Sequence, residues 1–322
     1  MIVRLGYVAM STIVQNASPS KTMTATFFRK LPDREAAIRK LERIAAENLH
    51  NTLRLLRHNR AFDIRMYRFS SKLIPLIGHE LLQGWDPFPA LEDDFRAIGD
   101  YVREHDMRVS FHPDHFTVLS TPRPEVLRNS VDDLRRHVRM LDAMGLDERA
   151  MCNIHVGGTY GDRVQARDRF VKQFQEMDGP IRRRITLEND DKTFTAEETL
   201  DICEAVGTPM VLDIHHHGVN PGEHTAGQLW PRITNTWATR ALPPKIHMSS
   251  PKSLKDVRGH ADYVEADKLL AFLRMAAEAG TERLDVMLEA KMKDAALLRL
   301  MEDIRNRSGI RIADQACFEI RA

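Results

Sequence analysis

Eight short segments of apolar or alternating character recur along the chain, and each is followed by a stretch with helical periodicity. Strands and helices that alternate in this way predict parallel strands joined by crossover helices. Eight such units favour closure into a single (β/α)8 TIM barrel, an α/β fold, over an open sheet. The expected strands span residues 3–8, 64–69, 107–112, 151–156, 184–189, 209–214, 245–249 and 284–290.

The helical stretches between these strands are long and amphipathic. They cover residues 33–57, 91–104, 124–144, 163–177, 195–205, 228–239, 265–277 and 294–305. Asp33 is placed to cap the first of them, and residues 195–198 read as a capping box. Because such a barrel needs about 250 residues, we expect residues 1–305 to form one barrel domain. Residues 306–322 are a C-terminal extension to which the sequence assigns no structure.

Charge and cysteine content restrict the class of protein only weakly. The 47 basic and 46 acidic side chains leave a net charge of +1, so a nucleic-acid site would have to be a local feature. Cys152, Cys203 and Cys317 include no CxxC pair, which is typical of a reduced intracellular protein. The sequence shows neither a signal peptide nor an apolar span of ~20 residues. We therefore expect a cytoplasmic protein without a membrane partner.

Histidine and acidic residues stand at the C-terminal ends of six expected strands. They are His112, His155, Glu188, Asp213 (followed by three histidines), His247 and Glu289, and His260 follows in the loop after the seventh strand. A lone histidine at a strand end is more often a hydrogen-bonded core or loop residue, but six such ends are hard to explain in that way. The C-terminal face is where barrel enzymes place their active sites, so we expect one site there.

The composition of this set indicates metal chemistry. It is rich in histidine, holds three carboxylates and lacks thiolates, which suits zinc, manganese or iron and suits magnesium less well. Shared carboxylates predict two or three ions about 3.5–4 Å apart, an arrangement that serves phosphodiester hydrolysis. Strand periodicity alone places Lys245 on the face of His247 and favours His215 as the neighbour of Asp213.

The motifs at these strand ends resemble those of the UV damage endonuclease family, which is related to endonuclease IV and the xylose-isomerase-like barrels. The matching segments include Phe111-His112-Pro113, residues 155–161, Leu187-Glu188-Asn189-Asp190, Asp213-Ile214-His215-His216, residues 245–250 and Glu289-Ala290-Lys291. They occur in the family's order from Arg4-Leu5-Gly6-Tyr7 to about Asp303, nearly the whole chain.

The resemblance implies a manganese-dependent endonuclease that acts on damaged double-stranded DNA. Such an enzyme nicks the strand immediately 5′ of UV photoproducts, both cyclobutane dimers and 6-4 products, and leaves a 3′-hydroxyl. The implied mechanism is in-line attack by a metal-bound hydroxide. We expect a monomer that needs no nucleotide cofactor.

Carried over residue by residue, the family's metal ligands fall on eight positions. They are His112, His155, Glu188, Asp213, His216, His247, His260 and Glu289. Glu188 is then the bridging carboxylate, and the D-x-x-H spacing of the family selects His216 over His215. The family also has a lysine at position 245. Because a free ammonium would repel metal ions, we hypothesise that Lys245 is N-carboxylated, and we expect Glu188, Asp213, Lys245, His247 and Glu289 to be the catalytic set.

Recognition of a lesion requires unstacked bases and a wedge that fills the gap. Tyr7, at the end of the first strand, is the best wedge candidate, and the alternative is a packed aromatic at the barrel mouth. His115 and Phe116 follow His112 and form the second candidate; the family commonly has glutamine where this chain has His115. Lys291 is a candidate phosphate contact.

Three other functions fit parts of this pattern. An apurinic endonuclease of the endonuclease IV type would use the same barrel and differ in the lesion it cuts. A metal-dependent sugar isomerase or epimerase would need fewer ions and would not cut DNA. A non-catalytic lesion-binding module would not need ligands for several metals.

Overall fold

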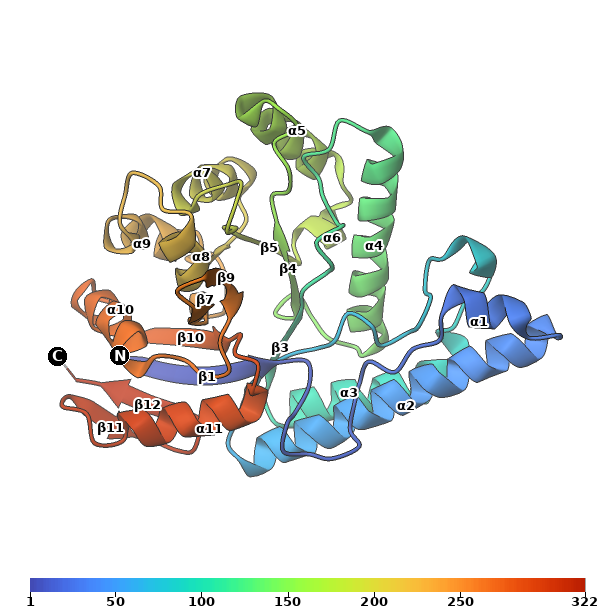
Figure 1. Ribbon diagram of the computed structural model, residues 1–322, viewed down its shortest axis with the longest axis horizontal. Coiled ribbons are helices and arrows are strands. Elements are labelled where there is room, and N and C mark those ends of the chain that lie inside the picture. Colours follow the sequence, from blue (N-terminus) through green and yellow to red (C-terminus); the bar gives the residue numbers. More distant parts are fainter. Residues whose placement is uncertain (322) are drawn as a thin grey trace.

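The computed structural model describes residues 1–321 and contains a closed barrel of eight parallel strands (Figure 1). Each strand pairs with the next around the ring, and β10 pairs with β1 to close it. All eight predicted strands, and the α/β barrel itself, are confirmed. The barrel strands are β1 (Ile2–Val8), β2 (Met66–Arg68), β3 (Arg108–Phe111), β4 (Met151–His155), β5 (Ile185–Glu188), β6 (Met210–Asp213), β7 (Lys245–Met248) and β10 (Arg283–Leu288).

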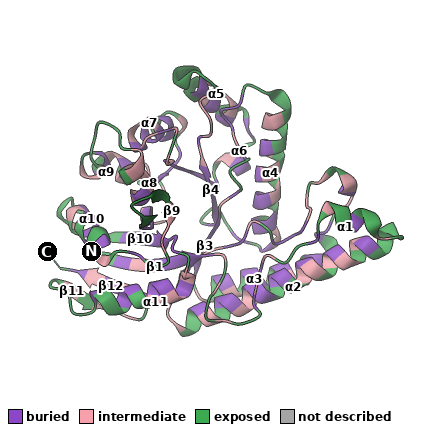
Figure 2. Ribbon diagram, viewed as in Figure 1, coloured by how far each residue is buried: buried purple, intermediate pink, exposed green. Residues whose placement is uncertain are grey.

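Eight longer helices surround the barrel and correspond to the eight predicted stretches. They are α2 (Arg34–Ala61), α3 (Glu92–Glu104), α4 (Pro124–Ala143), α5 (Arg163–Glu176), α7 (Ala196–Val206), α9 (Ala226–Asn235), α10 (Ala266–Glu278) and α11 (Lys293–Ile304). Their buried faces point at the strands and their exposed faces point outward (Figure 2). Asp33 accepts hydrogen bonds from the backbone of α2, and the capping box at Thr195 and Glu198 is formed.

Several short elements were not predicted, because they span too few residues to show a period. The helical ones are α1 (Ala25–Lys30), η1 (Glu80–Leu82), η2 (Pro89–Leu91), α6 (Gly179–Arg182) and α8 (Ile214–Val219). Two further strands, β8 (Pro251–Ser253) and β9 (Asp256–His260), form an antiparallel hairpin directly after β7. Both α8 and this hairpin lie beside the strand ends that carry the candidate ligands.

The C-terminal residues extend the sheet. Strands β11 (Ile310–Ile312) and β12 (Cys317–Ile320) are antiparallel, and β12 pairs with the first three residues of β1. Strand β2 pairs only with the last three residues of β1, so β12 occupies the part of that edge that β2 does not reach. The extension is thus a hairpin bound to the barrel, and the division of the chain at residue 305 stays a prediction.

No helix within residues 1–321 combines the length and the apolar character that crossing a bilayer requires.

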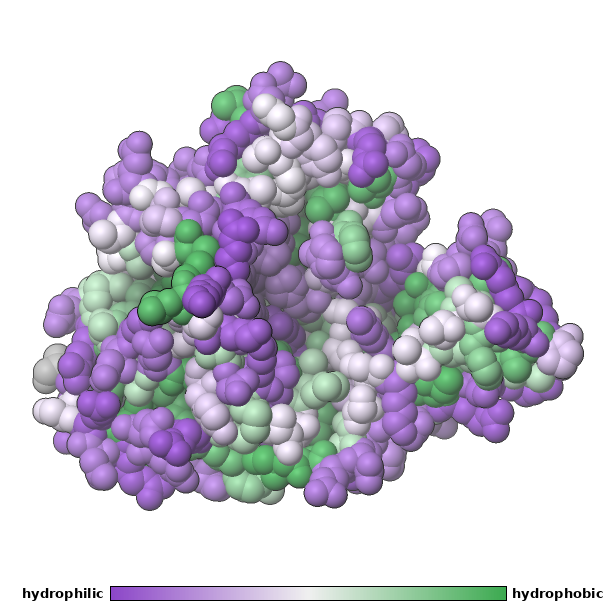
Figure 3. Space-filling view, in the orientation of Figure 1, coloured by the Kyte–Doolittle hydropathy of each residue, from purple (hydrophilic) through white to green (hydrophobic). Residues whose placement is uncertain are grey.

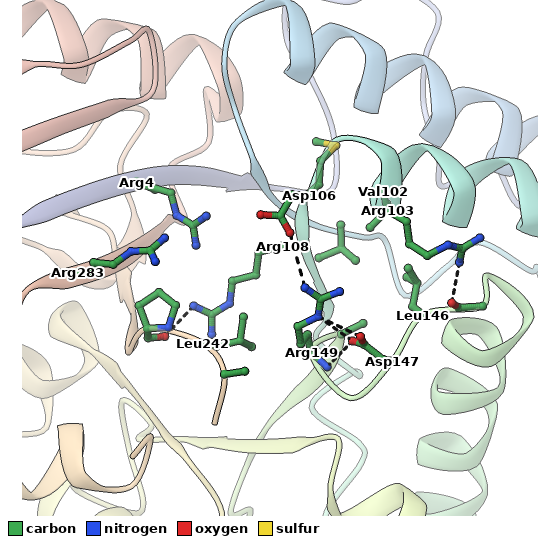
Figure 4. A pocket seen from close by; sticks show the side chains of 16 residues that line it. Arg4, Val102, Arg103, Asp106, Arg108, Leu146, Asp147, Arg149, Leu242 and Arg283 are labelled. Carbon is green, nitrogen blue, oxygen red and sulfur yellow. Dashed lines mark hydrogen bonds and ion pairs between the residues drawn. The ribbon is translucent and has the colours of Figure 1, made fainter. Parts of the chain in front are cut away.

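Polar side chains fill the barrel end opposite the candidate ligands. Asp285 is fully buried and accepts two 2.7 Å hydrogen bonds from Arg4 and one of 2.6 Å from Arg108. A cavity of about 200 Å³ opens beside these arginines, and Arg149 lies across it from Arg108 (Figure 4). Arg149 is paired with Asp147 at 3.0 Å, so carboxylates of the protein already neutralise much of this arginine cluster.

Candidate metal centre

The ends of β3, β4, β5, β6, β7 and β10 bring their acidic and histidine side chains together. Three groups result, and within each group the potential ligand atoms all lie within 4.8 Å of one another. The groups are His112, His155 and Glu188; Glu188, Asp213 and His216; and Glu188, His247 and Glu289. All six predicted strand-end positions belong to this cluster. Glu188 is the residue that the three groups share, which is the position that a bridging carboxylate would occupy.

Glu188 is almost completely buried at the centre of the cluster, with 1% of its surface exposed. Its Oε2 lies 3.2 Å from Nε2 of His112 and accepts a hydrogen bond from the amide of Asn153. Its Oε1 lies 3.5 Å from Nδ1 of His216. Strand β5 fixes this position, because the end of β5 pairs with β4 on one side and β6 on the other.

Asp213 and His216 become neighbours because the chain changes from strand to helix. Strand β6 ends at Asp213, whose carboxylate caps α8 by accepting a 2.7 Å hydrogen bond from the backbone N–H of His216. The third residue of a helical turn returns to the side of the cap, so Nδ1 of His216 lies 3.7 Å from Oδ2 of Asp213. His215 instead turns toward the hairpin, with Nε2 3.4 Å from the carbonyl oxygen of Arg258. Strand periodicity alone had favoured His215.

His247 and Glu289 complete the third group. Nδ1 of His247 lies 3.1 Å from Oε1 of Glu289, and Arg68 forms an ion pair with the same carboxylate. Nδ1 of His260 lies 2.7 Å from the backbone oxygen of Glu289, in hydrogen-bonding geometry, and 3.8 Å from its Oε2. Among the described residues, His260 is therefore adjacent to the three groups but belongs to none of them.

The acidic and basic side chains of the cluster shift one another's pKa values toward the charged forms. Burial alone would raise the pKa of Glu188, but His247 and His155 hold that pKa well below its usual range. The pKa of Glu289 is also well below its usual range, because Arg68 and His247 outweigh burial. For His216, burial lowers the pKa, but Asp213 and Glu188 raise it to about 9. Two ionised carboxylates thus stand at the centre of the cluster, where they can attract cations.

Several buried polar atoms of the cluster lack a hydrogen-bond partner among residues 1–321. They are Oε1 of Glu188, Oδ2 of Asp213 and both ring nitrogens of His247. Nδ1 of His247 is near two carboxylates, yet it is not oriented to donate to either. A buried polar atom without a partner costs about 1–3 kcal/mol, and a bound ion would remove that cost. Oxygen and nitrogen donors without thiolates fit Mn²⁺ or Zn²⁺.

Lys245 lies directly below this cluster, two residues before His247 on β7. It is 3% exposed, and within the described part of the chain its ammonium makes neither a hydrogen bond nor an ion pair. Burial, together with Arg108 and Arg68, lowers its pKa to about 7. A buried amine with this environment is unusual for a purely structural lysine.

The loop after β3 presents the second predicted wedge to solvent. The side chain of His115 is 75% exposed and Phe116 is 74% exposed. Their rings lie 4.0 Å apart, and Nδ1 of His115 is 2.6 Å from Asp114. Lys291 is exposed in the loop after β10. These three side chains are accessible to a ligand as large as DNA.

Tyr7 does not lie where a wedge would have to lie. It is fully buried, and its hydroxyl donates a 2.7 Å hydrogen bond to Oδ1 of Asn59 on α2. Its ring also makes an edge contact with Tyr67. Tyr7 shares the outward face of β1 with Val3 and Leu5, so it packs between the barrel and the helices. This placement argues against the wedge role and agrees with the alternative of a packed aromatic.

The roles of three residues in the site were not predicted from the sequence. Arg68 neutralises Glu289, and Asn153 donates to Glu188. The side chain of Asn189 holds both backbone polar groups of Asp213, at 2.9 and 3.0 Å. The sequence contained only weak indications of the two asparagines: Asn153 shares a strand face with His155, and Asn189 directly follows Glu188.

Known proteins resemble this chain in sequence and in overall fold. The chain is 44% identical to the UV DNA damage endonuclease of Halalkalibacterium halodurans over 319 residues, which is 99% of each protein. The crystal structure of SacUVDE matches with a TM-score of 0.82 and 26% identity, over 94% of this chain and 98% of that one. Endonuclease IV from Thermus thermophilus shares the fold, with a TM-score of 0.54 and 14% identity over 93% and 98% of the two chains. The model of the UV-endonuclease UvdE family matches residues 3–319, and the chain therefore belongs to that family.

Proposed function

We propose that this protein is a metal-dependent endonuclease that nicks UV-damaged double-stranded DNA. The observation that carries the proposal is Glu188, the single carboxylate shared by three ligand groups, in a chain that matches the UvdE family over nearly its whole length. We further propose that the cut falls immediately 5′ of cyclobutane dimers and 6-4 products and leaves a 3′-hydroxyl. In this proposal the protein acts as a cytoplasmic monomer, without a nucleotide cofactor.

Two or three Mn²⁺ ions are the proposed cofactor. The residues that would hold them are those of the three groups, with His260 as a further neighbour: His112, His155, Glu188, Asp213, His216, His247, His260 and Glu289. Bound divalent cations supply Lewis acidity, which lowers the pKa of water and offsets the charge that develops on a phosphodiester. Zn²⁺ fits the same donors, whereas Mg²⁺ prefers sites with more oxygen.

The protein's own residues orient this chemistry. Asn153 fixes one oxygen of Glu188, and Asn189 fixes the backbone at Asp213. Arg68 lies on Glu289 and could turn toward a phosphate oxygen when a cation takes over the neutralisation of that carboxylate. These contacts hold the ligands in place before the substrate arrives, as residues behind metal ligands do in other sites.

Lys245 is proposed to be N-carboxylated. Its amine is buried beside the ligands and lacks a partner among residues 1–321, so as an ammonium it would repel cations bound next to it. Attack of the neutral amine on CO₂ forms an N–C bond and releases one proton. The product is a carbamate, which carries a negative charge and adds oxygen donors to the site. This change makes the position compatible with bound cations.

Lesion contact is assigned to the exposed loop after β3. Phe116 offers an apolar ring and His115 a polar one, and side chains of these kinds fill the gap left by unstacked bases. Lys291 is proposed to contact a phosphate.

The test is to incubate UV-irradiated supercoiled plasmid with the protein and Mn²⁺. Unirradiated plasmid and a chelated reaction are the controls, and a plasmid with abasic sites tests the endonuclease IV alternative. We expect nicking of the irradiated plasmid with metal only. Equal nicking in all reactions, or in none, would overturn the proposal. Preference for the abasic plasmid would favour an apurinic endonuclease, and conversion of sugars without nicking would favour an isomerase.

A further inference from the structure

The hairpin of β8 and β9 ends in an exposed apolar tip. Ser253 pairs with Asp256, so the turn consists of Leu254 and Lys255. Leu254 is 99% exposed, and Val257, just beyond the turn, is 46% exposed. A leucine in this position contributes no buried surface to folding.

The turn itself does not require these residues. Two-residue hairpin turns favour asparagine, aspartate and glycine, which adopt the required backbone angles most easily. Here the backbone N–H of Asp256 is bound by the hydroxyl of Ser253 at 3.1 Å, which stabilises the turn without help from Leu254. The presence of leucine at the tip is therefore better explained by something outside the chain that it contacts.

The base of the hairpin is fixed to the candidate metal centre. Strand β9 ends at His260, which bonds to the backbone of Glu289. The carbonyl oxygen of Arg258 contacts His215, and Ala261 donates a 2.8 Å hydrogen bond to Ser250. The hairpin therefore stands directly beside the ligand groups, with β9 in contact with α8 (Figure 1).

The hairpin is basic. Residues 251–260 contain three basic residues, Lys252, Lys255 and Arg258, and one acidic residue, Asp256, which gives them a net charge of +2 (three minus one). Lys252 pairs with Asp256 at 3.7 Å, and Arg258 pairs with Asp191, outside the hairpin, at 3.5 Å. All three basic side chains are exposed, and Lys255 makes no ion pair within residues 1–321. An apolar tip flanked by cations matches the grooves of a nucleic acid, where sugars and bases lie between phosphates.

The tip lies across the barrel mouth from Phe116. The barrel order is β1, β2, β3, β4, β5, β6, β7 and β10, so β3 and β7 are four strands apart in a ring of eight. Phe116 follows β3 and Leu254 follows β7, which places the two exposed apolar tips on opposite sides of the ligand groups. Figure 3 shows a hydrophilic hollow near the middle of this face, with hydrophobic side chains standing out in the region where Figure 1 shows β9.

We propose that the β8–β9 hairpin is a second DNA-contacting wall of the site, opposite the loop of Phe116. Leu254 packs into the minor groove of the damaged duplex, and Lys255 contacts a phosphate of its backbone. The duplex is thereby held from two sides over the ligand groups. This inference rests on the proposed function, and it adds a groove contact and a phosphate contact on the wall opposite the lesion wedge.

The two contacts predict different responses to substitution. Leu254→Ser is expected to weaken binding of an irradiated duplex about tenfold, with a smaller effect on unirradiated duplex. Serine cannot replace the apolar surface that Leu254 buries in the groove. The salt dependence of that binding should not change. Lys255→Ala is expected to flatten the plot of log affinity against log salt by about 0.9, the value for one lost phosphate contact.

Fluorescence anisotropy with Mn²⁺ and a duplex that carries a non-hydrolysable phosphonate linkage at the cut site measures both effects without cutting, and KM and kcat for plasmid nicking are measured with Mn²⁺. The matched controls are Ile2→Ser, an exposed apolar residue at the other end of the barrel, and Lys172→Ala on α5. Wild-type KM, affinity and salt slope in both hairpin variants would overturn this inference alone. A wild-type protein that neither binds nor nicks irradiated DNA would overturn the proposed function, and this inference with it.

Discussion

Nδ1 of His247 lies 3.1 Å from Oε2 of Glu188, and both side chains are almost completely buried. The two atoms approach without hydrogen-bonding geometry, as ligands around a shared cation do. Replacing Glu188 with glutamine keeps the shape but places an amide donor where an acceptor is needed. Glu188→Gln should lower the nicking rate by more than about 100-fold, beyond the usual effect of residues behind the ligands.

The matched control for this change is Glu176→Gln, which alters an exposed carboxylate on α5. It should nick irradiated plasmid at the wild-type rate, and circular dichroism should show both variants folded. A Glu188→Gln protein that is folded and fully active would exclude Glu188 as a bridging ligand.

Removal of metal should destabilise the protein. With the cations gone, the buried atoms of Glu188, Asp213 and His247 lack partners, and the carboxylates repel one another. Ions that bind only the folded state add about 2.7 kcal/mol to the free energy of unfolding at a concentration of 100 Kd. Thermal melts in chelator, and then with added Mn²⁺, Zn²⁺ or Mg²⁺, measure the shift in Tm. A Tm that is the same in chelator and in every metal would contradict the assignment of this cluster as a metal centre.

The carboxylation of Lys245 can be tested directly. Native mass spectrometry in bicarbonate should show the mass of one CO₂ added to the intact chain, and acid should remove it. Lys245→Ala should abolish the added mass, whereas Lys252→Ala, which changes an exposed lysine, should leave it in place. Electron density with an unmodified amine at Lys245 in a metal-loaded crystal would rule the modification out.

The sequence predicted the barrel and six strand-end residues of the cluster because both follow from strand periodicity. A parallel strand that is buried on both faces appears in the sequence as a short apolar run. In a closed parallel barrel the C-terminal ends of all strands lie at the same end of the barrel. The same periodicity failed at Asp213, since it treats residue 214 as strand, whereas α8 begins there and turns His216 inward. A period of two cannot indicate where the strand stops.

Contacts between distant segments could not be predicted. Arg68 and Glu289 are 221 residues apart, and their pairing depends on closure of the ring between β2, β1 and β10. The burial of Tyr7, in contrast, could have been predicted, because it shares the apolar face of Val3 and Leu5. A strand-end position alone predicts a side chain at the mouth of the barrel, whereas the side chain of Tyr7 points toward α2.

Asp285 should contribute strongly to stability at the opposite end of the barrel. Its carboxylate pairs with both Arg4 and Arg108, and Asp285→Asn would leave a buried guanidinium without its counter-charge. Loss of one partner from such a buried group costs about 3–5 kcal/mol. Asp201→Asn, which breaks an exposed pair with Arg232, should cost less than about 1 kcal/mol. Urea denaturation at pH 7 measures both changes, and equal effects would contradict this account.

The contribution of Asp285 should also depend on pH in a predictable direction. Burial alone would raise its pKa, but Arg108 and Arg4 outweigh burial and hold the pKa below its ordinary value. The folded protein therefore binds this proton less tightly than the unfolded chain, whose aspartates have a pKa of about 3.9. The stabilisation is complete above that value and is lost as the pH falls below it toward the folded pKa. The difference in unfolding free energy between wild type and Asp285→Asn should accordingly be constant from pH 7 to pH 5 and shrink below about pH 4. A difference that grows as the pH falls would show that Asp285 is protonated in the folded protein.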